Sequence, residues 1–106
     1  AYNEEFFGPV MLIFAVDNEE EAIRVANDTA YGLGGTIICK DEERAVKVAR
    51  QIDSGMVYIN KVTTSASELP FGGVKNSGYG RELSEEGIKE FVNKKLIRIS
   101  SPDAQY

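Results

Sequence analysis

The apolar residues of the chain occur in short continuous runs, each followed by a stretch in which they recur at helical spacing. Residues 10–16 form the first apolar run, a pattern typical of a strand covered on both faces. A helix is expected next, with Asp17 as its cap, Glu20 completing a capping box and Gly32 closing it. Between these signals, the helical spacing is carried by Ala22, Ile23, Ala26 and Ala30.

The same order then repeats along the chain. Residues 35–39 predict a second strand, Asp41 is expected to cap a second helix, and residues 56–60 predict a third strand. The apolar stripe of the second helix consists of Ala45, Val48, Ala49 and Ile52. This alternation predicts an α/β fold, a parallel sheet built from strand–helix–strand units with right-handed crossovers.

The last part of the chain follows a different pattern. Residues 61–83 show no apolar period, and an unstructured stretch of more than about 12–15 residues is usually functional or disordered. Ser84 is expected to cap a short helix over residues 85–93, and residues 96–100 alternate like a strand. Residues 101–106 predict a flexible tail.

Composition and charge exclude several classes of protein. The 106 residues are 42% hydrophobic and 27% charged, which predicts one soluble domain with a modest core. The net charge of −5 argues against a nucleic-acid partner, and no apolar run approaches the ~20 residues that span a membrane. The start lacks the features of a signal peptide, and a single cysteine fits a reducing compartment, so the expected location is the cytoplasm.

Much familiar site chemistry is missing from the sequence. Without histidine, the chain lacks the commonest general base and metal ligand, so no metal site is expected. The glycine-rich segment 68–83 does not match a phosphate-binding loop, because Tyr79 follows Gly78 where a lysine is required. Cys39 ends an apolar strand, which favours a buried, inert thiol; a reactive cysteine is the alternative, since Lys40 and a helix start follow it.

Two longer motifs point to a known family. The sequence EEFFGPV (4–10) enters an apolar strand, and PFGGVKNSGYGREL (70–83) follows some sixty residues later. Together with NDTAYGL (27–33) and GMVYIN (55–60), they resemble the aldehyde dehydrogenase family over residues 3–100. The resemblance is to the C-terminal part of the catalytic domain, and succinate-semialdehyde dehydrogenases resemble the chain most.

The resemblance implies an activity and a division of the chain. Members oxidise an aldehyde to its carboxylate with NAD or NADP: a cysteine attacks the aldehyde, hydride passes to the nicotinamide, and a glutamate-activated water hydrolyses the thioester. Residues 1–94 would belong to the catalytic domain, 95–100 would form an oligomerisation strand, and 101–106 a flexible tail. A homo-oligomer is therefore expected. The nucleophile and the general base would precede Ala1, so this chain would carry no catalytic residue and would be inactive alone.

The family pattern also implies cofactor- or substrate-binding roles for four residues. Glu5 would bind the nicotinamide ribose hydroxyls, since a carboxylate can accept two hydroxyl protons, and Phe7 would lie against the nicotinamide ring. Phe71 would line the substrate tunnel, and Ser65 would help to hold the distal carboxylate of a small aldehyde. For Ser65, a solvated loop residue is the alternative. For the whole chain, the alternative is a non-catalytic α/β module that associates through its last strand.

Overall fold

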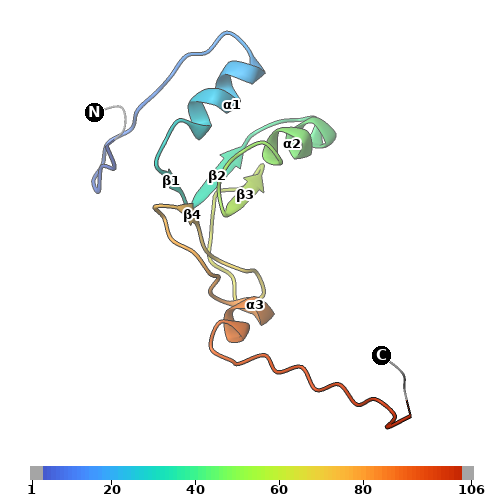
Figure 1. Ribbon diagram of the computed structural model, residues 1–106. Coiled ribbons are helices and arrows are strands. Elements are labelled where there is room, and N and C mark those ends of the chain that lie inside the picture. Colours follow the sequence, from blue (N-terminus) through green and yellow to red (C-terminus); the bar gives the residue numbers. More distant parts are fainter. Residues whose placement is uncertain (1–3, 104–106) are drawn as a thin grey trace.

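A computed structural model of the chain describes residues 4–103 (Figure 1). Its helices and strands are short. In chain order they are α1 (Glu19–Asn27), β1 (Tyr31–Gly32), β2 (Gly34–Ile37), α2 (Glu42–Ala49), β3 (Met56–Ile59), β4 (Val74–Lys75) and α3 (Ser84–Lys89).

The centre of the fold is the parallel pair β2–β3 with α2 packed on it. Gly34 lies opposite Met56, and Ile37 lies opposite Ile59. The core sits between this pair and α2, where Ala45 is 0% and Met56 7% exposed. A core of this size leaves most of the apolar surface uncovered. The sequence predicted three parallel strands, but the structure places only two in parallel.

Local side-chain chemistry fixes where α1 and α2 begin. Asp41 accepts a hydrogen bond from the backbone N–H of Arg44 at 3.0 Å, which confirms the predicted cap of α2. The cap of α1 is Asn18, one residue later than predicted. Its side chain accepts from the N–H of Glu21 at 2.9 Å, while the Glu21 carboxylate accepts from the N–H of Asp17 at 3.0 Å.

Helix α1 also ends earlier than predicted, at Asn27 instead of just before Gly32. The chain leaves the helix at Asp28, whose N–H reaches back to the carbonyl oxygens of Arg24 and Val25. It then enters β1, which pairs antiparallel with β4. Tyr31 lies opposite Lys75, and Gly32 lies opposite Val74. This second, antiparallel pair was not predicted.

The segment between β3 and α3 has more order than its lack of period predicted. It returns on itself through paired hydrogen bonds between the backbones of Phe71 and Glu82, at 2.8 and 2.6 Å. Helix α3 begins at Ser84 itself and ends at Lys89, short of the predicted residue 93. Ser84 is its first residue, and Leu83 occupies the cap position without a side-chain hydrogen bond.

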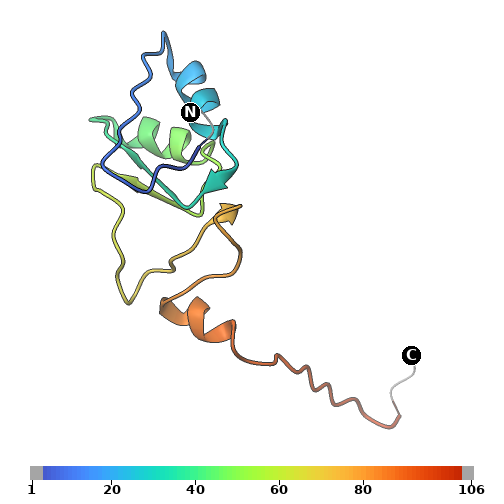
Figure 2. The same cartoon turned by 90° about the vertical axis from the view of Figure 1, so that its left-hand side faces the viewer.

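Extended segments run out from this body at both ends in Figure 1, and Figure 2 shows the C-terminal one again from the side. Residues 10–16 and 96–100 form no ladder with any described residue, so neither of the strands predicted there forms within this chain. The radius of gyration is 19.6 Å, against about 13 Å for a compact domain of this length. The single compact domain expected from composition is therefore corrected as well. Of the predicted tail, residues 104–106 lie outside the described residues.

Apolar side chains are exposed along both extended segments. The most exposed of them include Met11, Ile13, Leu96, Ile97 and Ile99. A strand needs a neighbour to complete its hydrogen-bond ladder, and no described segment supplies one here. Among the described residues, no helix has both the length and the apolar character needed to cross a bilayer.

Candidate functional site

Two neighbouring cavities flank the antiparallel β1–β4 pair. The first, of about 350 Å³, has Glu5 on its wall together with the backbone of residues 32–35. The second, of about 370 Å³, is lined by Phe71, Tyr79 and Arg81 among others. Leu33 and Ser77 line both cavities, so the two share a wall. The structure therefore brings Glu5 and Phe71, which are far apart in the sequence, to adjacent hollows.

Close backbone packing builds this region. A Cβ atom on Gly55 would overlap the carbonyl group of Gly72, and one on Gly32 would lie 2.5 Å from the carbonyl oxygen of Asp53. Real Cβ contacts do not reach these distances, so the approach of these backbones requires glycine. The glycine-rich segment is thus a tightly packed turn that carries Phe71 to the wall of a cavity.

Polar side chains hold the turn against β1. The Ser77 hydroxyl accepts a hydrogen bond from the N–H of Gly32 at 2.9 Å. The ammonium group of Lys75 donates to the carbonyl oxygens of Asn27 at 3.0 Å and Thr29 at 3.2 Å, and lies 3.8 Å from the Asp53 carboxylate. The three hydrogen bonds join segments more than forty residues apart, and together with the ion pair they hold the shared wall of the two cavities.

Arg81 organises the far side of the second cavity. Its Nη1 atom donates to the carbonyl oxygens of Gly73 at 3.0 Å and Gly80 at 2.7 Å. Its backbone N–H donates to the Glu90 carboxylate at 3.2 Å, which ties the turn to the end of α3. Sequence reasoning missed Arg81 and Lys75. The available signal was a charged residue inside a glycine-rich turn, where free backbone carbonyls need donors.

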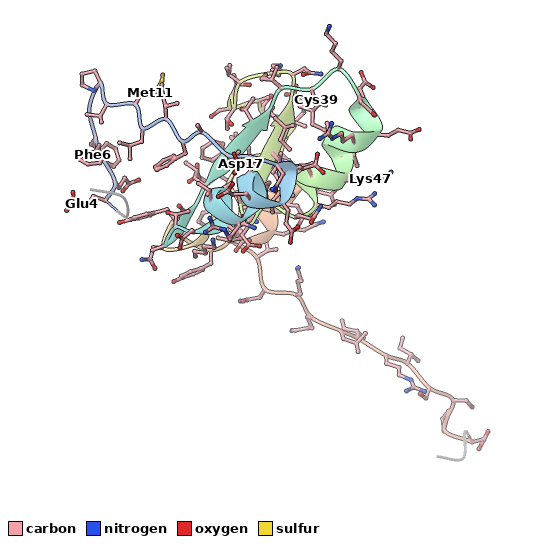
Figure 3. All side chains as sticks on the ribbon, turned by 90° about the horizontal axis from the view of Figure 1, so that it is seen from above. Glu4, Phe6, Met11, Asp17, Cys39 and Lys47 are labelled. Atoms are coloured by element: carbon pink, nitrogen blue, oxygen red, sulfur yellow. The ribbon has the colours of Figure 1, made fainter. Side chains whose placement is uncertain are left out.

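The four residues assigned from the sequence lie in different settings. Glu5 is exposed and lines the first cavity, and Phe71 is half-buried and lines the second. Phe7 is 95% exposed on the N-terminal arm, residues 4–16, and Figure 3 labels its neighbour Phe6 on the same arm. Ser65 is exposed on the loop between β3 and β4 and lines neither cavity.

One carboxylate on the same loop as Ser65 has a perturbed acidity. The pKa of Glu68 is lowered, chiefly by a hydrogen bond from its own backbone N–H and then by the Ser67 hydroxyl at 3.0 Å. The positive charge of Lys61 acts in the same direction. These three influences favour the ionised carboxylate and outweigh the opposing effect of desolvation, so Glu68 is negatively charged at neutral pH.

Two further shifts come from exposed ion pairs outside the two cavities. The pKa of Lys89 is raised by hydrogen bonds to Glu85 and Glu86, at 3.0 and 3.1 Å. The pKa of Arg44 is raised by Glu19, which accepts from its Nε at 2.5 Å. The second pair joins the N-terminal ends of α1 and α2, but exposed pairs contribute little stability.

The described residues can bind and orient a ligand, and they show no nucleophile paired with a base. No group of His, Cys, Asp or Glu among them is arranged to hold a metal ion. Cys39 is half-buried just after β2, at the opposite end of that strand from the cavity of Glu5. Figure 3 likewise shows Cys39 far from Glu4 and Phe6 on the arm.

Known proteins match this chain over nearly all of its length. The model of the "Aldehyde dehydrogenase family" matches residues 1–97. A succinate-semialdehyde dehydrogenase [NADP(+)] of Deinococcus radiodurans is 55% identical over 98 residues, which is 92% of this chain and 20% of the relative. This chain therefore spans about a fifth of the length of the curated relatives that it matches.

Solved structures match the fold as well. The succinic semialdehyde dehydrogenase of Streptococcus pyogenes, crystallised in complex with NADP+, superposes with a TM-score of 0.91 at 58% identity, over 94% of this chain and 22% of that one. A salicylaldehyde dehydrogenase of Pseudomonas putida G7, complexed with salicylaldehyde, gives a TM-score of 0.88 at 40% identity, over 99% of this chain and 22% of that one.

Proposed function

Because the chain belongs to the aldehyde dehydrogenase family, we propose that it works as the C-terminal part of the catalytic domain of a longer NAD(P)-dependent enzyme. That enzyme oxidises succinate semialdehyde, or a similar short aldehyde, to its carboxylate. The main support is the likeness of the fold, over 94% of the chain, to a succinic semialdehyde dehydrogenase in complex with NADP+. The first curated relatives carry the same substrate in their names.

The residues of the N-terminal arm fit a nicotinamide cofactor. Glu5 offers an exposed carboxylate on a cavity wall, and Phe7 offers a bare aromatic face on the same extended segment. A carboxylate that accepts from ribose hydroxyls and a flat apolar face for the ring are the groups that such a ligand requires. When bound, the nicotinamide supplies the hydride acceptor.

The second cavity fits the substrate side of the reaction. Phe71 and Leu33 contribute apolar wall to it, and Arg81 lines it as well. In this proposal Phe71 lines the path of the aldehyde, and Ser65 contacts the far end of the substrate. The chain itself then supplies binding, orientation and exclusion of water, whereas the nucleophilic cysteine and the general-base glutamate come from the remainder of the enzyme.

The same proposal covers assembly and location. The exposed apolar residues of 95–100 suit a strand that pairs with another subunit, so we expect a homo-oligomer. A single cysteine fits a reducing location such as the cytoplasm.

Steady-state kinetics of the full-length protein test the proposal. Formation of NADH or NADPH is followed with succinate semialdehyde and with butanal, which has the same carbon chain without the carboxylate. We expect kcat/KM to be higher for succinate semialdehyde by about tenfold or more, as a charge-assisted contact to its carboxylate would give. An enzyme that oxidises neither aldehyde with either cofactor would refute the assignment.

A further inference from the structure

The loop of residues 61–67 is held to the body at three of its backbone carbonyl oxygens. The Thr36 hydroxyl donates to the carbonyl of Lys61 at 3.2 Å. The Tyr58 hydroxyl donates to the carbonyl of Thr64 at 2.8 Å. Near the far end, the backbone N–H of Ser84 donates to the carbonyl of Ser67 at 2.9 Å. The loop therefore has a defined path although it lacks regular structure.

The bond from Tyr58 holds the peptide group that precedes Ser65, the residue assigned to the substrate. The Thr64 carbonyl belongs to the peptide group that joins Thr64 to Ser65. That group is planar, so holding its oxygen also holds the nitrogen of Ser65 and limits the directions in which the Ser65 side chain can point. The other two anchors lie at Lys61 and Ser67, so neither fixes this peptide group.

Tyr58 is itself held in the central parallel pair β2–β3. It lies in β3, half-buried, directly opposite Thr36 in the parallel pairing with β2. Paired residues of neighbouring parallel strands project to the same face, and both of these hydroxyls reach the loop. On the same stretch, a Cβ atom on Gly34 would lie 3.1 Å from the Thr63 methyl group, so the loop packs closely against β2.

We propose that Tyr58 is a positioning residue for substrate selection: its hydroxyl holds the Thr64–Ser65 peptide so that Ser65 is presented to the far end of the aldehyde. This inference rests on the proposed function, in which Ser65 contacts that end of the substrate. Loss of the bond leaves Ser65 chemically intact but free to take other directions. Recognition of the distal group then weakens, and the chemistry at the aldehyde carbon is unaffected.

The test is a double-mutant cycle in the full-length enzyme, with Tyr58→Phe and Ser65→Ala as the single changes. Tyr58→Phe should raise KM for succinate semialdehyde by about five- to tenfold, the size of one lost hydrogen bond. KM for butanal and for the cofactor should change less than twofold. In the Ser65→Ala background, Tyr58→Phe should have no further effect on succinate semialdehyde, because the two residues act through one contact.

Thr36→Val is the matched control, since it removes the hydroxyl that holds Lys61 and leaves the Thr64–Ser65 peptide bonded. It should not change the ratio of kcat/KM between the two aldehydes. Equal losses for both aldehydes in Tyr58→Phe, or an effect that persists without the Ser65 hydroxyl, would overturn the inference while leaving the proposed function standing. A wild-type enzyme that oxidises neither aldehyde would instead overturn the proposed function, and the inference with it.

Discussion

The side-chain carbonyl of Asn27 accepts a hydrogen bond from the backbone N–H of Asp53 at 2.8 Å and so joins the end of α1 to the loop after α2. The amide nitrogen of the same side chain donates to the carbonyl oxygen of Gln51 at 2.7 Å. One side chain thus satisfies two backbone groups that lie more than twenty residues away. Because Asp53 also forms part of the first cavity, the pair helps to shape the candidate site.

Asn27→Ala should therefore destabilise the full-length enzyme. Both backbone groups of the loop lose their partner, and each unsatisfied group costs about 1–3 kcal/mol when water cannot reach it. Since this loop is largely exposed, water can replace part of the lost bonding, and we expect a total loss of about 1 kcal/mol, seen as a lower midpoint in denaturant unfolding. Asn76→Ala, on an exposed residue of the glycine-rich turn, is the control and should leave the midpoint unchanged. Equal midpoints for both variants would contradict the role given to Asn27.

The boundaries of α1 and α2 show what local sequence can and cannot determine. Asp41 was predictable as a cap because its partner lies three residues away. For α1 the prediction of Asp17 with Glu20 was one residue too early, because Asn18 with Glu21 has the same spacing and the structure uses that pair. Only the folded geometry selected Asn18.

Contacts between segments far apart in the chain could not be predicted from the sequence for a different reason. The β1–β4 pair is two residues long and carries no apolar pattern; it is fixed by side chains such as Lys75 and Ser77 that reach across it. Residues 10–16 have the composition of a strand, yet none of the described residues supplies their neighbour. In the candidate site, the family motif assigned Glu5 and Phe71, and the structure shows that each lines a cavity. The bond from Tyr58 could not be predicted, because it depends on the path of a loop that has no sequence pattern.

Glu5→Gln should slow hydride transfer in the full-length enzyme more than it affects folding. The amide keeps the shape of the side chain but loses the charge that favours two ribose hydroxyls, so the nicotinamide is placed less well. A displacement of about 1 Å at a reacting group can cost on the order of 100-fold in rate. Single-turnover formation of NADH or NADPH measures this step, with Glu4→Gln as the adjacent control. Unchanged kcat and cofactor affinity in Glu5→Gln would exclude the ribose contact.

Glu68 should give the enzyme a small dependence of stability on pH. Its pKa is lowered in the folded state, first by its own backbone N–H and then by Ser67, so its contribution is complete above the ordinary glutamate pKa of about 4.3. That contribution is lost as the pH falls through the lowered value. The difference in melting temperature between wild type and Glu68→Gln should therefore shrink on acidification. At neutral pH, the effect of Glu68→Gln on the melting temperature should be smaller in a Ser67→Ala background than in the wild type. A difference independent of pH would contradict this origin.

The isolated chain should be inactive and should self-associate. Both extended segments expose apolar side chains, among them Met11 and Ile99, and unpaired apolar segments are ready partners for each other. Sedimentation at tens of micromolar, roughly the range in which weak association shows, should reveal a dimer or larger species. Replacing Ile97 and Ile99 with serine should shift the population toward monomer. A clean monomer of the unaltered chain, or aldehyde-dependent NADH formation by it, would contradict this expectation.

Cys39 should be dispensable for turnover. Its thiol is half-buried beside Ile37, Ala45 and Val48, less covered than the apolar strand predicted, and it lies at the far end of β2 from the cavity of Glu5. No histidine exists in the chain to take its proton. The Asn60 side chain fixes its backbone from both sides, accepting from the N–H at 2.9 Å and donating to the carbonyl at 2.8 Å.

Cys39→Ala in the full-length enzyme should accordingly keep kcat and KM near the wild-type values. The free energy of unfolding should fall by roughly 1 kcal/mol, because a small side chain leaves a small, partly open space and the bonds from Asn60 to the backbone persist. Asn60→Ala provides the contrast, since it removes both of those bonds and should cost more stability than the loss of the thiol. A well-folded Cys39→Ala enzyme without turnover would place the nucleophile in this chain. It would contradict the proposal that the nucleophilic cysteine comes from the rest of the enzyme.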